Sequence, residues 1–241
     1  MPRPHYQALL VDLDGTLLEI DMDRFIAVYM QRLAHSFTDY TAPEQFAAHL
    51  LGATGAMVRS ADPVTINETV FFDDFCRRIG QPHAAVRPVF DRFYETEFPH
   101  LKPCSNPRPH AGAVVESARG KGLKLALATN PIFPRIAVEH RLAWTGLSGD
   151  DFDLITTVEN MHYCKPKLEY YLETAKLLDC PPALCLMAGN DVQEDLAAAA
   201  VGMDTFMVDD FLLHRRKEEE PLCTYRGSLK NLVDFIEALD G

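Results

Sequence analysis

The chain has 241 residues, of which 47% are hydrophobic, and it carries a formal charge of −12 at pH 7. This length suffices for one large domain or for a core domain with a smaller insert. The acidic charge argues against a nucleic-acid partner, because binding to phosphates needs clustered Lys and Arg. The longest basic cluster, HRRK at 214–217, is followed by three glutamates and is expected to form a solvated loop.

Apolar patterning and cysteine usage indicate the cellular environment. No apolar run approaches the roughly 20 residues that span a bilayer, and the amino terminus MPRPHYQ lacks the apolar segment of a signal peptide. The six cysteines form no CxxC pair and no regular spacing, which fits neither a disulfide framework nor a zinc ribbon. We therefore expect a cytoplasmic protein with reduced thiols and no membrane partner.

Short apolar runs typical of buried strands alternate with helix-like segments along much of the chain. These runs lie at 8–14, 123–130, 152–158, 183–189 and 205–210. Strands that alternate with helices favour βαβ units. The pattern predicts an α/β fold with a mostly parallel sheet and helices on both of its faces.

The interval between residues 18 and 104 breaks this alternation. It contains no comparable strand run, but apolar residues recur there at three and four residues, which is typical of helices. The expected helical segments are 25–37, 43–58, 67–79 and 84–98. Pro43 is expected near the start of the second, and Asn67 and Gly80 are expected to cap the two ends of the third. We therefore expect a helical insert at 18–104 and a core formed by 1–17 and 105–241.

Two aspartates stand in the first apolar run, in the stretch VDLDGTL. Burying an ionised carboxylate is costly unless it is paired or holds a metal, so Asp12 and Asp14 indicate a site. The Gly15–Thr16 turn follows, so both aspartates can reach beyond the end of the strand.

Further polar residues follow the other strand runs. In open α/β sheets, ligands bind outside the carboxyl ends of the strands, so these residues are candidates for one shared site. Asp191 and Asp195 are expected to share one face at the start of a helix. The candidates are Thr129, Asn130, Lys165, Asp191 and Asp195. Carboxylates with a hydroxyl and a lysine suit a magnesium ion and a phosphoryl group, and a carboxylate can act as a nucleophile.

Four ordered motifs carry a family resemblance. DLDGTL at 12–17, ATN at 128–130, KPK at 165–167 and GNDVQED at 189–195 resemble the signature motifs of the haloacid dehalogenase superfamily. The insert at 18–104 resembles the helical cap of the phosphoglycolate-phosphatase-like branch. Only about 35 residues separate the second motif from the third, which leaves no room there for the larger α/β cap of other branches. The resemblance implies a Rossmann-like three-layer α/β core with an inserted all-helical cap domain.

The resemblance also implies a role for each motif residue. Asp12 would be the nucleophile that forms an aspartyl-phosphate, and Asp14 would be the general acid and then the general base. The residues that would contact phosphate are Gly15, Thr129 through its hydroxyl, Asn130 through its backbone amide, and Lys165. Mg²⁺ would be held by Asp12, by the backbone carbonyl of Asp14 and by Asp191, with Asp195 supporting these ligands from behind.

The expected function is that of a magnesium-dependent phosphatase acting on a small phosphorylated metabolite. Two alternatives stay open, a phosphomutase of the same superfamily and a regulatory module that accepts phosphate without turnover. Dehalogenation is disfavoured, because the dehalogenases of the superfamily carry a residue other than aspartate at the position of Asp14. Phosphonate hydrolysis would need an amine from the cap, and the four helical segments contain no lysine. The sequence leaves the oligomeric state and the identity of the substrate open.

Overall fold

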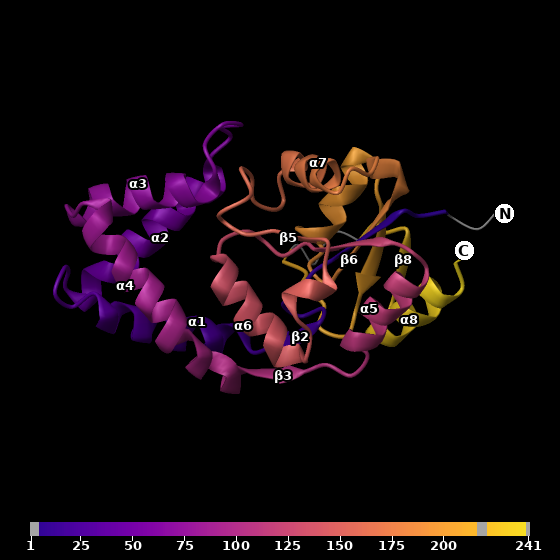
Figure 1. The fold of residues 1–241 in the computed structure, drawn as a ribbon, viewed down its shortest axis with the longest axis horizontal. Helices are drawn as coiled ribbons and strands as arrows, with labels where there is room; N and C mark the ends of the chain where they lie inside the picture. The colour runs from indigo at the N-terminus through magenta and orange to yellow at the C-terminus, as the bar shows by residue number, and fades with distance from the viewer. Residues whose placement is uncertain (1–4, 216–220, 240–241) are drawn as a thin grey trace.

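A computed structural model describes residues 5–215 and 221–239 of the chain. The main sheet, with helices packed around it, forms one part of the molecule, and a group of helices beside it forms the other (Figure 1). Of the basic cluster at 214–217, Arg216 and Lys217 lie outside the described residues, as do the three glutamates that follow. None of the described helices combines the length and apolar character needed to cross a membrane.

The main sheet is parallel throughout its described strands, which run in the order β5-β4-β1-β6-β7-β8. Their bounds are β1 Ala8–Val11, β4 Lys124–Leu127, β5 Leu154–Ile155, β6 Cys185–Gly189, β7 Asp204–Val208 and β8 Tyr225–Gly227. Val11 at the end of β1 is in register with Leu127 of β4 and Ala188 of β6, so the three strands end side by side. Each of the five predicted strand runs contains a strand of this sheet. The sixth strand, β8, was not predicted, because it is a short and partly exposed edge strand without an apolar run.

The side chains of β1 alternate between two apolar layers. Leu9 and Val11 join a cluster that includes residues of α5, α6 and α8, whereas Ala8 and Leu10 join a cluster with residues of α7 and η4. The bounds are α5 Ala111–Gly120, α6 Arg135–Thr145, η2 Gly149–Asp151, α7 Leu168–Leu177, η3 Pro182–Leu184, η4 Asp195–Val201 and α8 Leu229–Glu237. A strand buried on both faces must be apolar throughout, which explains the continuous run ALLV. The predicted three-layer α/β core is therefore present.

Residues 18–107, all of them described, contain the expected helices. They are α1 Met22–Ser36, α2 Pro43–Arg59, α3 Asn67–Ile79 and α4 His83–Thr96, and in Figure 1 they gather to one side of the sheet. Aromatic rings fill the space between them: the ring of Phe37 lies 4.9 Å from that of Phe90 and 5.1 Å from that of Phe46. We refer to these four helices as the cap.

The predicted helix ends were partly correct. Pro43 occupies the first turn of α2, and Gly80 ends α3 in the left-handed region with φ of 66°. The prediction that Asn67 caps α3 was wrong, because Ile66 holds that position and Asn67 is the first residue of the helix. The Asn67 side chain instead donates to the backbone carbonyl oxygens of Pro131 and Tyr163, at 3.4 and 3.5 Å. Asn67 therefore ties the cap to the sheet domain.

Backbone hydrogen bonds join the cap to the sheet domain both at the chain crossings and at the start of α3. Strand β2 (Leu18–Ile20) pairs antiparallel with β3 (Ser105–Pro107), which follows the short helix η1 (Phe98–Cys104) and brings the two crossings of the chain together. The prediction of no strand between 18 and 104 was wrong at β2, which is too short to give an apolar run. At the other end of the cap, the backbone N–H groups of Asn67 and Glu68 donate to the carbonyl oxygens of Met161 and Val158, at 2.8 and 2.9 Å.

Candidate active site

A buried lysine connects two of the predicted carboxylates. Lys165 Nζ lies 3.0 Å from Asp12 Oδ1 and 2.6 Å from Asp195 Oδ1, and the Lys165 side chain is only 1% exposed. Burial opposes the charge of Lys165, but the two carboxylates outweigh it and raise the pKa of the ammonium well above its ordinary value. Burial raises the pKa of Asp12 to about 8; Lys165 counteracts this increase, while Asp195 and Asp14 add to it. Burial is therefore the main obstacle to a charged Asp12, and Lys165 is the group that offsets it.

The turn after Asp14 is packed against the end of β6. Gly15 has φ of 85°, and a Cβ atom there would lie 2.2 Å from Asn190 Nδ2, so only glycine fits. Thr16 Oγ1 donates to Asn190 Oδ1 at 3.0 Å. This contact holds the turn, and with it the backbone around Asp14, beside the neighbouring strand.

Thr129 and Asn130 follow β4 as predicted. The carbonyl oxygen of Thr129 accepts from Thr156 Oγ1 at 2.7 Å and from the Tyr170 hydroxyl at 3.0 Å. Asn130 Nδ2 donates to Glu194 Oε2 at 3.1 Å, in the segment that follows β6. These bonds fix the backbone at the end of β4, where the resemblance implies phosphate contacts.

The arrangement of Asp191 and Asp195 differs from the prediction that they share a helix face. Asp195 begins the short helix η4, whereas Asp191 lies in the turn before it. Asp195 Oδ2 accepts from the backbone N–H of Asp191 at 2.8 Å, and its other oxygen binds Lys165. A Cβ at Gly189 would lie 2.1 Å from Asp195 Oδ2, so that glycine makes room for the carboxylate. Asp195 thus supports the positions of Lys165 and Asp191 from behind.

Arg215 was missed as a site residue, because its basic cluster was interpreted as a solvated loop. Its guanidinium pairs with both carboxylate oxygens of Asp191: Nη1 lies 2.9 Å from Oδ1 and Nη2 lies 2.7 Å from Oδ2. The Arg215 side chain is 57% exposed, so this ion pair lies at the solvent edge of the site. Any cation that binds Asp191 competes with it.

Arg141 on α6 was also missed. Its side chain is 1% exposed, and Nη1 donates to Asp14 Oδ2. The neighbours of Arg141 on the same helix face, Val138 and Leu142, are buried apolar residues. The signal in the sequence was therefore a charged residue on the face of a helix that packs against the sheet.

The residues at this edge fit a magnesium ion that takes few ligands from the protein and fills its other positions with water. Asp12 and Asp191 follow the neighbouring strands β1 and β6, and they supply the hard oxygen ligands that Mg²⁺ prefers. Over the described ranges, no three Asp, Glu, His or Cys side chains converge closely enough to hold an ion by themselves. Mg²⁺ is commonly held by one or two carboxylates together with water, so two carboxylates and the Asp14 carbonyl suffice.

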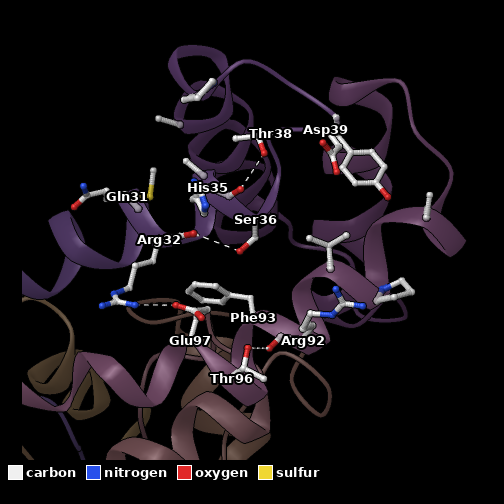
Figure 2. A pocket seen from close by; sticks show the side chains of 18 of the residues that line it. Gln31, Arg32, His35, Ser36, Thr38, Asp39, Arg92, Phe93, Thr96 and Glu97 are labelled. Atoms are coloured by element: carbon white, nitrogen blue, oxygen red, sulfur yellow. Dashed lines mark hydrogen bonds and ion pairs between the residues drawn. The ribbon is translucent and has the colours of Figure 1, made fainter.

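One large cavity lies away from these residues. It has a volume of about 1190 Å³ and is lined by α1, α4 and the segment between α1 and α2 (Figure 2). A second cavity of about 390 Å³ lies between the cap helices and the segments 132–139 and 158–159 of the sheet domain. Tyr29 and Tyr94 line this second cavity, and their hydroxyls lie 2.9 Å apart. None of the proposed catalytic residues lines this cavity either, but it lies where the cap faces the sheet domain, so it is the better candidate for a substrate pocket.

Sequence comparisons identify relatives of this chain. A family model described as haloacid dehalogenase-like hydrolase matches residues 6–202. YhcW of Bacillus subtilis (strain 168), whose name assigns it provisionally as a phosphatase, is 35% identical over 101 residues, which are 42% of this chain and 44% of YhcW. Protein CbbY of Rhodobacter capsulatus is 26% identical over 193 residues, which are 80% of each chain. This chain thus spans less than half of the length of YhcW.

Solved structures share the fold. A haloacid dehalogenase-superfamily phosphatase from Thermococcus onnurineus superposes with a TM-score of 0.58 at 19% identity, covering 95% of this chain and 97% of its own. The L-2-haloacid dehalogenase from Xanthobacter autotrophicus with chloropropionic acid covalently bound gives a TM-score of 0.57 at 16% identity, covering 98% and 100%. Phosphatase and dehalogenase structures thus resemble this chain about equally, so its chemistry must be argued from the residues of the site.

Proposed function

The chain belongs to the haloacid dehalogenase-like hydrolases, and from this premise we propose that it is a magnesium-dependent phosphatase acting on a small phosphate monoester. The observation that carries the proposal is the arrangement of Asp12, Asp14 and Lys165. Asp12 directly follows strand β1 and is held by the buried Lys165. Asp14 follows two residues later, at the start of a turn whose next position, 15, accepts only glycine. The phosphatase assignment of YhcW supports it.

The reaction proceeds in two steps. Asp12 attacks the phosphorus atom of the ester, and the leaving oxygen takes a proton from Asp14, which gives an aspartyl-phosphate and an alcohol. Asp14 then takes a proton from a water molecule that attacks the same phosphorus atom, which releases inorganic phosphate and restores Asp12. Lys165 holds Asp12 in position and offers its positive charge to the phosphoryl oxygens.

The metal ion adds charge at the same place. Asp12, Asp191 and the Asp14 carbonyl would hold Mg²⁺, which when bound neutralises negative charge on the nucleophile and on the phosphoryl group. Asp195 keeps the Asp191 backbone in place through its hydrogen bond of 2.8 Å. Arg215 must share or release the Asp191 carboxylate for the ion to bind there.

The size of the pocket favours a small leaving group. The cavity between the cap and the sheet domain has a volume of about 390 Å³, which lies within the range of small-molecule pockets, roughly 300–1,000 Å³. Asp14 disfavours the dehalogenase reaction, because a halide leaves without a proton and needs no acid at this position. A phosphomutase and a phosphate-accepting regulatory module remain alternative outcomes.

The test is release of inorganic phosphate from a panel of phosphate monoesters, with and without Mg²⁺, by the wild type and by Asp12→Asn. Turnover that requires Mg²⁺ and is lost in Asp12→Asn supports the proposal. Activity that survives Asp12→Asn overturns the role of Asp12 as nucleophile. Transfer of phosphate to another position of the substrate without its release indicates a mutase, and a stable phosphoprotein without turnover indicates a regulatory module.

A further inference from the structure

The guanidinium of Arg141 is buried and held on several sides. Its side chain is 1% exposed, its Nε donates to the Ala137 carbonyl oxygen at 3.3 Å, and its Cζ lies 4.6 Å from the centre of the Phe133 ring. A buried arginine needs a carboxylate partner, because burial of an unpaired charge is costly. The carboxylate that meets it is that of Asp14, the second aspartate of the sequence motif DLDGTL.

The ion pair leaves the two carboxylate oxygens of Asp14 in different environments. Oδ2 accepts from Arg141 Nη1, whereas Oδ1 is buried and has no hydrogen-bond partner among the described residues. A buried carboxylate oxygen without a partner is unusual, since buried polar atoms are nearly always satisfied. The free oxygen is therefore the one that is open to a group absent from the structure, such as the leaving oxygen of a substrate.

We propose that Arg141 is a positioning residue for the general acid and base: it holds Asp14 through Oδ2 so that Oδ1 delivers and removes the proton. This inference rests on the phosphatase function proposed above. In the described part of the chain Arg141 makes no hydrogen bond or ion pair with Asp12 or Lys165, and its Nη2 is buried without a partner. The contact that links Arg141 to a reacting group is the one to Asp14. It belongs to α6, whose buried residues join the apolar cluster of β1, and a site residue held on a packed helix suits a positioning role.

The chemistry of the leaving group separates this role from a general structural one. An alkoxide is a poor leaving group and needs the proton of Asp14, whereas p-nitrophenolate is stable and leaves without one. The value of kcat/KM covers the steps up to departure of the leaving group. Loss of Asp14 positioning should therefore lower kcat/KM for an alkyl phosphate much more than for p-nitrophenyl phosphate.

The experiment measures kcat/KM on p-nitrophenyl phosphate and on the best alkyl phosphate of the panel for wild type, Arg141→Met and Arg141→Lys. The ratio of the two values does not depend on how much of a variant is folded. We expect Arg141→Met to lower the alkyl-to-aryl ratio by roughly 10²-fold, the scale of general acid catalysis, and Arg141→Lys to recover part of it. Arg226→Met is the matched control, since Arg226 also pairs with a carboxylate, that of Asp209, but is 52% exposed and lines neither cavity; its ratio should equal that of the wild type.

A second arm places Arg141→Met in an Asp14→Asn background. If Arg141 acts through Asp14, the substitution should change the alkyl-to-aryl ratio no further there. An unchanged ratio in Arg141→Met, or an equal further loss in the Asp14→Asn background, would overturn the positioning role while leaving the phosphatase intact. A wild type that releases no phosphate, or an Asp12→Asn variant that retains activity, would instead overturn the proposed function itself.

Discussion

Different interactions stabilise the two regions of the molecule, the carboxyl edge of the sheet and the cap. At the sheet edge, Lys165 and Arg141 are each 1% exposed and pair with carboxylates of the site. The buried interior of the cap is filled by aromatic rings, and Phe75 lies within 6.0 Å of four of them, the nearest being Phe90 at 5.3 Å. Charge pairs depend on the identity and position of single atoms, whereas ring packing depends on volume and shape.

The comparison teaches which substitutions each region tolerates. A change that preserves size but removes charge should damage the sheet edge, and a change that preserves apolar volume should be tolerated in the cap. Substitutions at the sheet edge should lower both stability and turnover, because its ion pairs position reacting groups. Substitutions of Phe75 should lower stability alone, because its ring contacts position no reacting group. Substitutions in both regions test this difference, and Lys165 is the position where the loss should be greatest.

Lys165→Met should be the most damaging change. It keeps most of the side-chain length but leaves Asp12 and Asp195 buried without their cation. Breaking a buried ion pair from one side costs about 3–5 kcal/mol, so the free energy of unfolding in urea should fall by that amount and turnover should be lost. The matched control is Lys167→Met, two residues away, because Lys167 donates to the carbonyl oxygens of Val58 and Ser60 at the end of α2 and pairs with no carboxylate among the described residues. Equal losses in the two variants would contradict the special role of charge at the sheet edge.

Phe75→Ala should destabilise the cap without removing the chemistry. Phe75 is fully buried, and truncation of a buried phenylalanine costs about 3–5 kcal/mol. Turnover of p-nitrophenyl phosphate per folded molecule should stay close to wild type, because Phe75 makes no contact with the catalytic residues. Phe75→Leu, which keeps most of the apolar volume, should lose less stability. A loss of turnover in the folded fraction that matches Lys165→Met would erase the distinction between the two regions.

Gly15→Ala at the sheet edge and Gly80→Ala in the cap should introduce similar backbone strain, so a difference in their effects reports on the surroundings of each glycine. Both glycines have positive φ, 85° and 66°, and an L-residue in that region costs about 1–2 kcal/mol. At Gly80 nothing lies within 4 Å of the added Cβ, whereas at Gly15 the Cβ would meet Asn190 at 2.2 Å. Thermal unfolding should show a loss of stability in both variants, and activity assays should show a loss of turnover in Gly15→Ala alone. Full activity in Gly15→Ala would show that the turn beside Asp14 can move without consequence.

The sequence predicted the two regions with different success. Hydrophobic periodicity located the helices of the cap and the strands of the main sheet, because both depend on patterns spread over many residues. It missed β2 and β8, which are three residues long, and it misplaced Asn67, whose contacts come from loops almost a hundred residues away. Such long-range contacts leave no periodic signal in the chain.

The site was predicted where neighbouring residues form a motif and missed where a partner comes from elsewhere in the chain. Asp12, Lys165 and Asp195 meet as expected. Arg141 and Arg215 complete the charge pairs of Asp14 and Asp191, but each lies in a segment that reads as an ordinary helix or loop. A charged residue on an apolar helix face is the one available signal, and it identifies burial without naming the partner.

The reactivity of Cys164 can show whether the cap opens away from the sheet domain while the sheet stays folded. It directly precedes Lys165, and its Sγ lies 3.5 Å from Nδ2 of the cap residue Asn67. Burial raises the pKa of this thiol to about 12, and burial also raises the pKa of Cys185, inside the sheet, to about 12. At pH 8 only roughly 10⁻⁴ of either thiol is ionised, and alkylation must await an opening that restores the ordinary pKa near 8.5.

If the cap opens about β2 and β3 while the sheet stays folded, iodoacetamide should label Cys164 faster than Cys185, as measured by mass spectrometry of peptides over time. Raising the pH should speed the labelling of both, since the thiolate is the reactive form. Asn67→Ala, which removes a contact between the cap and the sheet domain, should speed the labelling of Cys164 and leave that of Cys185 unchanged. Equal rates for the two cysteines would mean that they are exposed together by global unfolding, and that the cap does not move independently of the site it covers.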